Sequence, residues 1–426
     1  MLKGYVQKRL ENYVIRYFAK HPDVKLVAVT GSIGKTGTKR AIATVLSRRF
    51  RVGMHDDTSS THLTVPLSIL GIVYPEKPHS PLAWHRVFSA ARQRIQSPTT
   101  VDVIIQDLNA NRPGDISSYS RYLRPDISVI TGITPERIES FQSIDILAAE
   151  EMALNQFSGQ VLINRDDIDA KYAAMLVNPS INTYGTTGFA EYRFEISEFT
   201  LNGGYVGSVI APEYPNPINA QAKVIGEHSL RPIMAAVAVA TKMQMLPEEI
   251  ANGIAAITAT PGRMNLLYGI GDTHIIDDTA SSSPGSALAA LQALYAIDAP
   301  QRIAILGSMS GLGNVSADEH KKIGAECNPD LLSWVVTVGK DANQYLGPEA
   351  RARGCQVKAF DSAIDAGAFV RSVSDEGAVI LAKGSKNGIY LEEAIKVLCE
   401  MSEDIELVRQ TPEYMEIKNN FFSKFS

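Results

Sequence analysis

Short, nearly continuous apolar runs alternate with amphipathic stretches along most of the chain. The first half contains four such runs, KLVAVT, VDVIIQD, DISVITGI and GQVLIN, and the second half contains HIIDD, RIAILG, WVVTVG and AVILAKG. Runs of this kind are typical of parallel strands whose two faces are buried by helices. The pattern therefore predicts an α/β fold with mainly parallel sheets.

Three other stretches depart from this rhythm. The N-terminal stretch MLKGYVQKRLENYVIRYFAKHP, residues 1–22, alternates charged and apolar residues at helical spacing, which predicts an amphipathic helix and neither a signal peptide nor a membrane span. The polar, Gly-rich stretch around residues 186–215 predicts an antiparallel insert. In ITATPGRMN a helical pattern ends at Pro261 and Gly262 before strands resume. We therefore expect two domains, residues 1–260 and residues 261–426.

Composition and charge narrow the classes of function. A chain of 426 residues with 45% hydrophobic residues is long enough for two or three domain cores. A net charge of −5 without a basic block argues against nucleic acid as the main partner. Cys327, Cys355 and Cys399 lack C-x-x-C spacing and are odd in number, which favours reduced thiols. We expect a cytoplasmic protein with no membrane span.

The stretch LVAVTGSIGKTGTKRAI, residues 26–42, is similar to a phosphate-binding loop with shortened spacing. In the usual G-x-x-x-x-G-K-[ST] pattern a glycine would stand at Val29. The glycines here nevertheless follow a predicted strand and begin a predicted helix, where backbone N–H groups and the helix dipole converge on a phosphate. Lys35 would reach the β- and γ-phosphates, and Thr36 would offer its hydroxyl to Mg²⁺. The alternative is a glycine turn with a chance Lys-Thr pair, but the position between strand and helix favours a nucleotide site.

The loop TGSIGKT is similar to the T-G-x-x-G-K-T loop of the Mur ligase family, and further family segments follow in the same order. They are DLNANRPGDI (107–116), TGITPERIESFQSIDILAAEE (131–151), IGEHS (225–229), PGRMN (261–265), IIDDTASSSPGS (275–286), ILGSMSGLG (305–313) with His320 after it, and AKGSKN (382–387). Together they most resemble the branch that adds D-alanyl-D-alanine to a UDP-muramoyl tripeptide. The domain with which that branch binds the UDP-sugar has no counterpart in these segments, and the predicted N-terminal helix stands in its place.

The resemblance implies a central ATPase domain with a mainly parallel sheet, a C-terminal Rossmann-like domain, and ATP with Mg²⁺ as cofactors. It implies a peptidoglycan-related ligase in which ATP phosphorylates a carboxylate and an amine attacks the acyl phosphate. The same resemblance assigns residues to four roles. Expected catalytic residues are Lys35, Arg137, Glu151 and Arg263, and expected metal ligands are Thr36 and Asp107. Expected nucleotide contacts are Gly31, Ser32, Gly34, Lys35, Thr36, Gly37, His228, Ser229, Arg263 and Asp278, and expected substrate contacts are Ser60, Thr61, Lys383 and Ser385.

Three positions near the phosphate loop depart from the family pattern. Asp107 stands where the family has a glutamate for Mg²⁺, and the alternative is a solvated carboxylate at a strand end. Arg137 and Glu151 stand where the family has a histidine and a carbamylated lysine that place a second Mg²⁺. Glu151 would then supply the anion without CO₂, and Arg137 a fixed cation in place of the second metal. The alternative is that Glu150 and Glu151 form a solvated helix face and that the second metal site is lost.

Other departures affect the nucleotide and substrate contacts. His228-Ser229 stands where the family has a His-Asn pair at a helix start, and the alternative is that His228 is only a polar residue at that start. Asp278 belongs to an acidic pair near the ribose, but the Tyr and Asn that usually follow the pair are replaced. Ser60 and Thr61 replace two asparagines on the substrate side. ATP recognition is therefore expected, whereas the substrates stay unidentified.

Three functions remain open from the sequence. The first, which the ordered segments favour, is a Mur-type ligase that acts on a small-molecule or peptide carboxylate and an amine. The second is a nucleotide-binding subunit or pseudoenzyme that needs a partner protein to supply the missing substrate domain. The third is another kind of P-loop hydrolase or kinase, which the series of segments across two domains disfavours.

Overall fold

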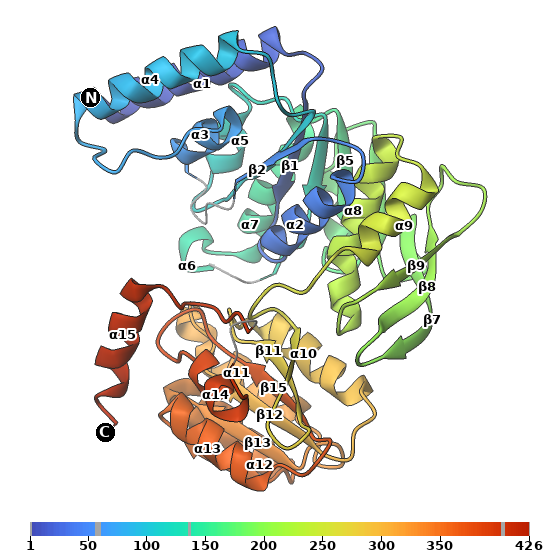
Figure 1. The fold of residues 1–426 in the computed structure, drawn as a ribbon, viewed down its shortest axis with the longest axis vertical. Coiled ribbons are helices and arrows are strands. Elements are labelled where there is room, and N and C mark those ends of the chain that lie inside the picture. Colours follow the sequence, from blue (N-terminus) through green and yellow to red (C-terminus); the bar gives the residue numbers. More distant parts are fainter. Residues whose placement is uncertain (1, 56–60, 135–137, 402–404, 426) are drawn as a thin grey trace. The chain divides into compact units, whose positions relative to one another are not determined.

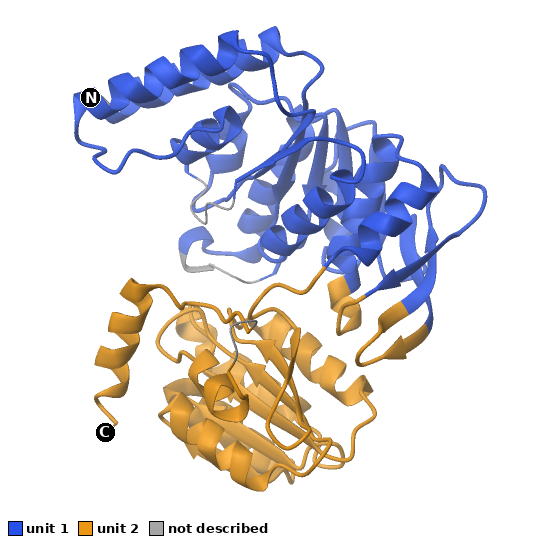
Figure 2. Cartoon of the chain, viewed as in Figure 1, with its two compact units in different colours: residues 1–197, 206–222, 230–257 blue, residues 198–205, 223–229, 258–426 orange. Residues whose placement is uncertain are grey.

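The computed structural model describes residues 2–55, 61–134, 138–401 and 405–425, and the chain divides into two compact units (Figure 1, Figure 2). The predicted α/β class with mainly parallel sheets is confirmed. Unit 1 contains Met1–Ser197, Val206–Ala222 and Leu230–Ile257, and unit 2 contains Glu198–Tyr205, Lys223–Ser229 and Thr258–Ser426. The domain boundary expected between residues 260 and 261 stays a prediction. All residues from Thr258 onward belong to unit 2, which also includes the two short segments Glu198–Tyr205 and Lys223–Ser229.

Unit 1 is built on a sheet that has nine strands over the described residues, in the order β2-β3-β1-β4-β5-β6-β7-β8-β9. The strands are β1 (Lys25–Thr30), β2 (Val52–Met54), β3 (Val103–Asp107), β4 (Ile127–Ile130), β5 (Gln160–Asn164), β6 (Ile181–Gly185), β7 (Tyr192–Thr200), β8 (Gly204–Ile210) and β9 (Ile218–Ala222). Neighbouring strands from β2 to β7 in this order run parallel, so the carboxyl ends of β1, β3, β4 and β5 meet at one edge. At that edge Val29 lies beside Asp107, and Thr30 lies beside Ile130. The loop after β1 therefore emerges between the ends of β3 and β4.

The strands β7 and β8 form the antiparallel insert expected around residues 186–215. They are neighbours in the sheet and are joined by residues 201–203, a connection too short for a parallel crossover. The tip of this hairpin belongs to unit 2, where Phe199 and Leu201 pack against the core.

Helices pack on the strands of unit 1 in two groups. The helices α1, α3 and α4 share one core with Leu26 and Ala28 of β1, whereas α2 and α8 pack against each other and against neighbouring strands. The helical segments are α1 (Leu2–Lys20), α2 (Lys35–Leu46), α3 (Thr64–Leu70), α4 (Pro81–Gln96), α5 (Asp115–Tyr119), α6 (Ile138–Phe141), α7 (Ile144–Met152), η1 (Ala153–Phe157), η2 (Ala170–Met175), α8 (Leu230–Lys242) and α9 (Pro247–Ala255).

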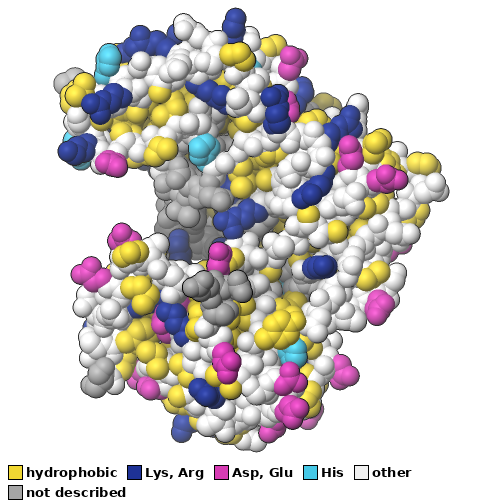
Figure 3. All heavy atoms as spheres, in the orientation of Figure 1, with side chains coloured by type: hydrophobic (Ala, Val, Ile, Leu, Met, Phe, Trp, Pro, Cys, Tyr) yellow, Lys and Arg dark blue, Asp and Glu magenta, His cyan; other side chains and the backbone are white. Residues whose placement is uncertain are grey.

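The predicted N-terminal helix is present as α1, and its two sides differ in character. The buried side consists of Val6, Leu10, Tyr13, Val14 and Tyr17, which recur at helical spacing. The exposed side carries basic residues, and Figure 3 shows Lys and Arg side chains over that part of the surface. No helix in the described ranges is long and apolar enough to cross a membrane.

Unit 2 is built on a six-stranded sheet in the order β10-β11-β15-β12-β13-β14, counted over the described residues. Its strands are β10 (Asn265–Tyr268), β11 (His274–Asp278), β12 (Arg302–Gly307), β13 (Trp334–Val338), β14 (Val357–Phe360) and β15 (Val379–Lys383), and β10 alone among these runs antiparallel to its neighbour. Its helical segments are η3 (Glu227–Ser229), α10 (Pro284–Ala296), η4 (Gly313–Val315), α11 (Ser316–Glu326), η5 (Ala342–Leu346), α12 (Gly347–Ala352), α13 (Ala363–Val373), α14 (Glu392–Leu398) and α15 (Pro412–Phe422). Because β11 and β15 are neighbours, Asp278 lies beside Lys383.

We predict that Leu10→Ala lowers the free energy of unfolding of unit 1 by about 2–5 kcal/mol, because Leu10 is 0% exposed and its removal leaves a cavity. Ile15→Ala on the same helix removes a similar side chain that is 44% exposed, and it should change stability by about 0.5 kcal/mol or less. Urea unfolding followed by the fluorescence of Trp84, in a Trp334→Phe background, reports unit 1 alone. Equal losses of unfolding free energy in Leu10→Ala and Ile15→Ala would contradict the packing of α1.

Candidate active site

The loop between β1 and α2 has a backbone that only glycine suits at two positions. Gly31 has φ +130° and Gly34 has φ +78°, both in the left-handed region. A Cβ atom on Gly31 would also overlap the hydroxyl of Thr131 at the end of β4. The predicted order of strand, glycine loop and helix is therefore present. The shortened spacing of the glycines fits a tight turn that packs against the end of β4.

Side chains and backbone of the neighbouring strand end hold this loop. The Ser32 N–H donates to the Gly132 carbonyl at 2.9 Å, and the Thr134 N–H donates to the Ser32 hydroxyl oxygen at 2.7 Å. The Thr131 hydroxyl donates to the Thr30 carbonyl at 3.0 Å. Ser32, an expected nucleotide contact, thus has a part in fixing the loop itself.

The expected nucleotide contacts Lys35, Thr36 and Gly37 form the first turn of α2. The first N–H groups of a helix have no partner within the helix and carry partial positive charge, which suits a phosphate. Gly34, the residue before the helix, has no side chain to cap these groups. The Lys35 ammonium folds back over the loop and donates to the Gly31 carbonyl. The helix start and this lysine therefore bring positive charge to the same loop.

Glu151, in the last turn of α7, lies beneath the loop and is only 2% exposed. Its Oε2 atom accepts the N–H of Gly31 at 2.9 Å and also the hydroxyl proton of Thr30. Hydrogen bonds to a charged group each contribute about 1.5–3 kcal/mol. The alternative of a solvated helix face is therefore wrong for Glu151.

The preceding residue, Glu150, holds a second loop at the same edge of the sheet. Its Oε2 accepts the N–H of Gly114 at 2.7 Å, and its Oε1 accepts the N–H of Ile116 at 2.5 Å, at the start of α5. Glu150 is 7% exposed, so it is not a solvated residue either. Two adjacent carboxylates thus fix the loop after β1 and the loop after β3.

Asp107, the expected Mg²⁺ ligand at the end of β3, is buried in an ion pair. The Lys39 ammonium lies 2.9 Å from its Oδ1 atom and also donates to the His55 carbonyl at 2.6 Å. The alternative of a solvated strand-end carboxylate is therefore wrong. Lys39 was not predicted from the sequence, although it stands one helical turn after Lys35, where a side chain reaches the same edge.

The donor set near the loop suits a Mg²⁺ ion that arrives with a nucleotide. No group of three or more His, Cys, Asp or Glu side chains converges on one point within the described ranges. Mg²⁺ commonly keeps several waters and binds through one or two carboxylates together with substrate phosphates. The Thr36 hydroxyl and the Asp107 carboxylate are donors of the required kind.

Two other parts of unit 1 bear on the expected substrate contacts. The Thr61 hydroxyl accepts the N–H of Thr64, the first residue of α3, at 3.2 Å. Next to it the His62 Nε2 atom lies 3.3 Å from Asp115, which Arg112 also contacts at 3.2 Å, a cluster that the sequence analysis missed. The signal that could have found part of the cluster is the pair of opposite charges in NRPGD, Arg112 and Asp115, three positions apart. Ser60 and Arg137 lie outside the described residues.

In unit 2 the expected residues of two motifs meet at the ends of β11 and β15. Asp278 forms an ion pair with Lys383 at 2.7 Å, and the Lys383 ammonium also donates to the Ser281 carbonyl at 2.8 Å. Ser385 is buried, and its hydroxyl has no hydrogen-bond partner in the part of the chain that the structure describes. The charge of Lys383 is therefore already balanced by Asp278.

The turn that carries Arg263 is tied to the same strand end. Asp277 accepts the N–H of Gly262 at 2.8 Å and the N–H of Thr279 at 3.1 Å, and burial raises the pKa of its carboxyl group. Gly262 has φ +72°, and Arg263 after it is exposed. Asp277 thus fixes the backbone around Arg263 and the start of the loop after β11.

The expected base contacts His228 and Ser229 lie in η3 of unit 2. Gly226 has φ +77°, and a Cβ atom there would lie 2.7 Å from the half-buried His228 ring. The Ser229 hydroxyl donates to the Ile225 carbonyl at 2.7 Å, so it holds the turn that precedes α8. Unit 1 therefore brings together the expected loop, metal and Glu151 positions, and unit 2 brings together Asp278, Lys383 and Arg263 on neighbouring segments.

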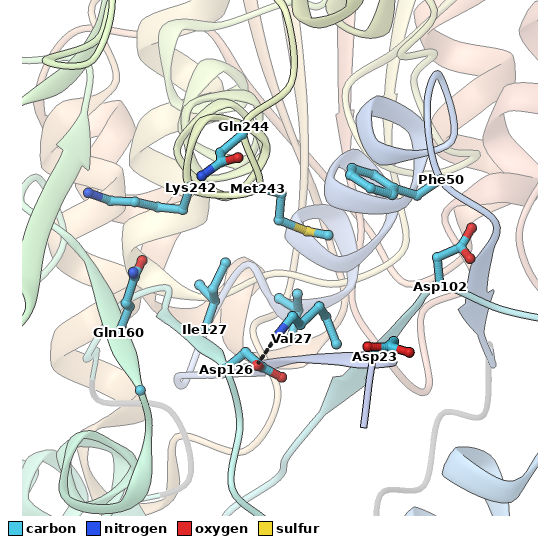
Figure 4. Close-up of a pocket in the computed structure, with 12 residues that line it drawn as sticks. Asp23, Val27, Phe50, Asp102, Asp126, Ile127, Gln160, Lys242, Met243 and Gln244 are labelled. Carbon is cyan, nitrogen blue, oxygen red and sulfur yellow. Dashed lines mark hydrogen bonds and ion pairs between the residues drawn. The ribbon is translucent and has the colours of Figure 1, made fainter. Parts of the chain in front are cut away.

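A cavity of about 590 Å³ lies at the other edge of the unit 1 sheet, at the amino ends of β1, β4 and β5 (Figure 4). None of the expected site residues lines it. Asp126 accepts the Lys25 ammonium at 3.0 Å and the Leu26 N–H at 2.9 Å, and hydrogen bonds from Arg51 hold the pKa of Asp102 at about 2. These carboxylates hold strand starts at the edge of the sheet opposite the glycine loop.

Comparison with known proteins finds similar sequences and similar folds. The Mur ligase middle domain matches residues 29–240, and the Mur ligase, glutamate ligase domain matches residues 262–386. The UDP-N-acetylmuramoyl-tripeptide--D-alanyl-D-alanine ligase of Bacillus subtilis is 26% identical over 390 residues, which are 88% of this chain and 76% of that protein. MurF from Acinetobacter baumannii has a TM-score of 0.74 at 22% identity and covers 92% of this chain and 80% of its own. MurF ligase from Thermotoga maritima in complex with ADP has a TM-score of 0.73 at 19% identity, with 92% and 83% covered.

We predict opposite effects for glutamine at the two adjacent glutamates. In Glu151 one oxygen accepts both bonds from Thr30 and Gly31, so a glutamine can keep these two bonds while the negative charge is lost. Glu151→Gln should therefore fold normally and lower ATP turnover at least tenfold, which is about 1.4 kcal/mol of barrier. Added bicarbonate should leave the wild-type rate unchanged, because Glu151 needs no CO₂ to be a carboxylate.

The matched control is Glu150→Gln. Each oxygen of Glu150 accepts a different backbone N–H, so a glutamine must set its NH₂ group against one of them. This variant should lose about 1–3 kcal/mol of stability in urea unfolding. Full turnover in Glu151→Gln, or wild-type stability in Glu150→Gln, would contradict the assigned roles.

Proposed function

The chain belongs to the Mur ligase family, and from this premise we propose that it is an ATP-dependent ligase that joins a carboxylate to an amine. The observation that carries the proposal is the glycine loop of unit 1, with Lys35 over it and Glu151 beneath it. Most of the charge at such a site serves phosphoryl transfer, which needs positioning and electrostatic stabilisation more than covalent help.

The proposed reaction has two steps. A carboxylate oxygen of the acid attacks the γ-phosphorus of ATP, and ADP leaves, which yields an acyl phosphate. The amine nitrogen then attacks the acyl carbon, the phosphate leaves with the former carboxylate oxygen, and the nitrogen loses a proton. The products are an amide, ADP and phosphate.

The residues of unit 1 would act on the phosphates. The Lys35 ammonium would leave the Gly31 carbonyl when ATP binds and offset the charge on the transferring group. Thr36 and Asp107 would hold Mg²⁺, which when bound supplies positive charge to the phosphate oxygens. Lys39 would keep the Asp107 carboxylate in place, and Glu151 would hold the loop and supply a fixed negative charge beneath it.

The expected residues of unit 2 would act on the nucleotide and on the amine. We propose that Asp278 contacts the ribose and that His228 and Ser229 contact the base. Arg263 would contact the phosphates. Lys383 and Ser385 would lie near the incoming amine, and the hydroxyl of Ser385 is the group that a polar substrate atom would satisfy. The Bacillus subtilis relative is named for a UDP-N-acetylmuramoyl tripeptide and D-alanyl-D-alanine. For this chain we propose an acid or peptide carboxylate and an amine, because Ser60 and Thr61 differ from the family's substrate pattern.

A nucleotide-binding subunit is the second candidate. It is favoured by the two ion pairs that already balance Asp107 and Lys383, since both groups would have to rearrange to serve a reaction. Such a subunit would bind ATP and would require a partner protein for the substrate.

One assay separates the two candidates. The protein is incubated with ATP and Mg²⁺ together with pools of carboxylic acids and amino acids, and phosphate release is followed. A ligase releases phosphate only when a matching acid and amine are both present. Binding of ATP without phosphate release in any pool would favour the nucleotide-binding subunit.

We predict that Lys35→Ala lowers ATP turnover by ~10²–10³, because a preorganised cation at a phosphoryl site contributes about 3–4 kcal/mol to the barrier. Stability in urea should be close to that of the wild type. Lys25→Ala is the control, because it removes an exposed lysine of the same unit from the opposite edge of the sheet. Undiminished turnover in folded Lys35→Ala would remove the loop from the mechanism.

A further inference from the structure

A buried cluster of charges joins α14 to the C-terminal segment 405–425 of unit 2. Glu392, which begins α14, is 0% exposed, and its carboxylate contacts two cations. The Arg409 Nε atom donates to Oε1 at 2.9 Å and its second terminal nitrogen donates to Oε2 at 2.5 Å, while the Lys418 ammonium lies 2.9 Å from Oε1. The side chains of Arg409 and Lys418 are 9% and 2% exposed. A buried carboxylate of this kind depends on such partners.

Arg409 and Lys418, the two cations that contact Glu392, differ in their other hydrogen-bond partners. The Arg409 guanidinium also donates to the carbonyl of Thr279 at 2.8 Å and to the carbonyl of Ala280 at 3.1 Å. Lys418 instead donates to Glu393 at 2.7 Å. Arg409 alone of this pair therefore reaches the loop after β11, and the planar fork of its donors allows it to hold the carboxylate and two carbonyls at once.

The loop that Arg409 holds begins with Asp278. Its backbone is also held by Asp277 and Lys383, which bind the Thr279 N–H and the Ser281 carbonyl. In addition, the Ala280 N–H donates to the Gly262 carbonyl at 3.0 Å and the Gly384 N–H donates to the Asp278 carbonyl at 3.1 Å. The loop continues as ASSS, whose short side chains reach little beyond the backbone. Hydrogen bonds to its backbone groups therefore hold the conformation of this loop.

We propose that Arg409 is a positioning residue for the nucleotide. It acts through the backbone of Thr279 and Ala280, and so fixes Asp278 before the ligand arrives. A loop that is held in its binding conformation loses less entropy when the ligand binds, and the affinity is correspondingly higher. The inference rests on the proposed function, in which Asp278 contacts the ribose.

The test compares two variants that each remove one cation from Glu392. Arg409→Lys keeps the positive charge but lacks the fork, so it cannot hold the carboxylate and both carbonyls. Lys418→Met removes the other charge and leaves the contacts of Arg409 with the loop intact. Arg409→Gln is a second variant at the same position, and the fluorescence of Trp334 in unit 2 verifies that each protein is folded.

Two measurements are made on the full chain. Hydrogen exchange of a peptide that covers residues 278–283 should be at least tenfold faster in Arg409→Lys and Arg409→Gln, and unchanged in Lys418→Met. The dissociation constant for MgATP, measured by calorimetry, should rise about tenfold in both Arg409 variants and stay within about twofold of the wild type in Lys418→Met. A general loss of stability would affect all three variants.

The outcomes separate the inference from the proposed function. If the wild type does not bind MgATP, the proposed function fails, and the inference that rests on it fails too. If the wild type binds MgATP but the Arg409 variants bind it equally well, or Lys418→Met weakens binding as much as they do, the inference alone is overturned. Unchanged exchange in the loop of the Arg409 variants overturns it as well.

Discussion

The glycine loop after β1 is held from within the protein by a buried carboxylate, that of Glu151. A buried charge must be satisfied by hydrogen bonds, so the hydroxyl of Thr30 and the N–H of Gly31 are held at fixed positions. The adjacent Glu150 does the same for the start of α5. Because α7 carries both glutamates, a single helix sets the relation between the loop after β1 and the loop after β3.

The same physical device recurs in unit 2. The loop after β11 is held by Asp277 from within, by the ion pair of Asp278 with Lys383, and by Arg409 on Glu392. In both units the apolar strands supply a rigid sheet, and buried charges at the carboxyl ends of the strands fix the loops to which we assign the chemistry. The charged groups are thus organised before any ligand binds, which is what phosphoryl transfer requires.

Much of the fold could be predicted from the sequence, because the eight apolar runs coincide with β1, β3, β4, β5, β11, β12, β13 and β15. The strands β2 and β14 were missed because they are short and only partly buried. The glycine loop was predicted because its pattern is local. The partners Lys39 and Arg409 were missed because their carboxylates lie 68 and 17 residues away in the chain. The idea of a solvated face at Glu150 and Glu151 failed because the last turn of α7 is buried, whereas its exposed residues Asp145, Ile146 and Ala149 come earlier in the helix.

The central claim is that ATP phosphorylates the carboxylate before the amine attacks it. The most direct measurement uses acids labelled with ¹⁸O in their carboxylates, together with ATP, Mg²⁺ and amines, and analyses the released phosphate by mass spectrometry. The account predicts one ¹⁸O atom in each phosphate, transferred from the carboxylate. Phosphate without the label, released at the same rate as amide forms, would contradict it.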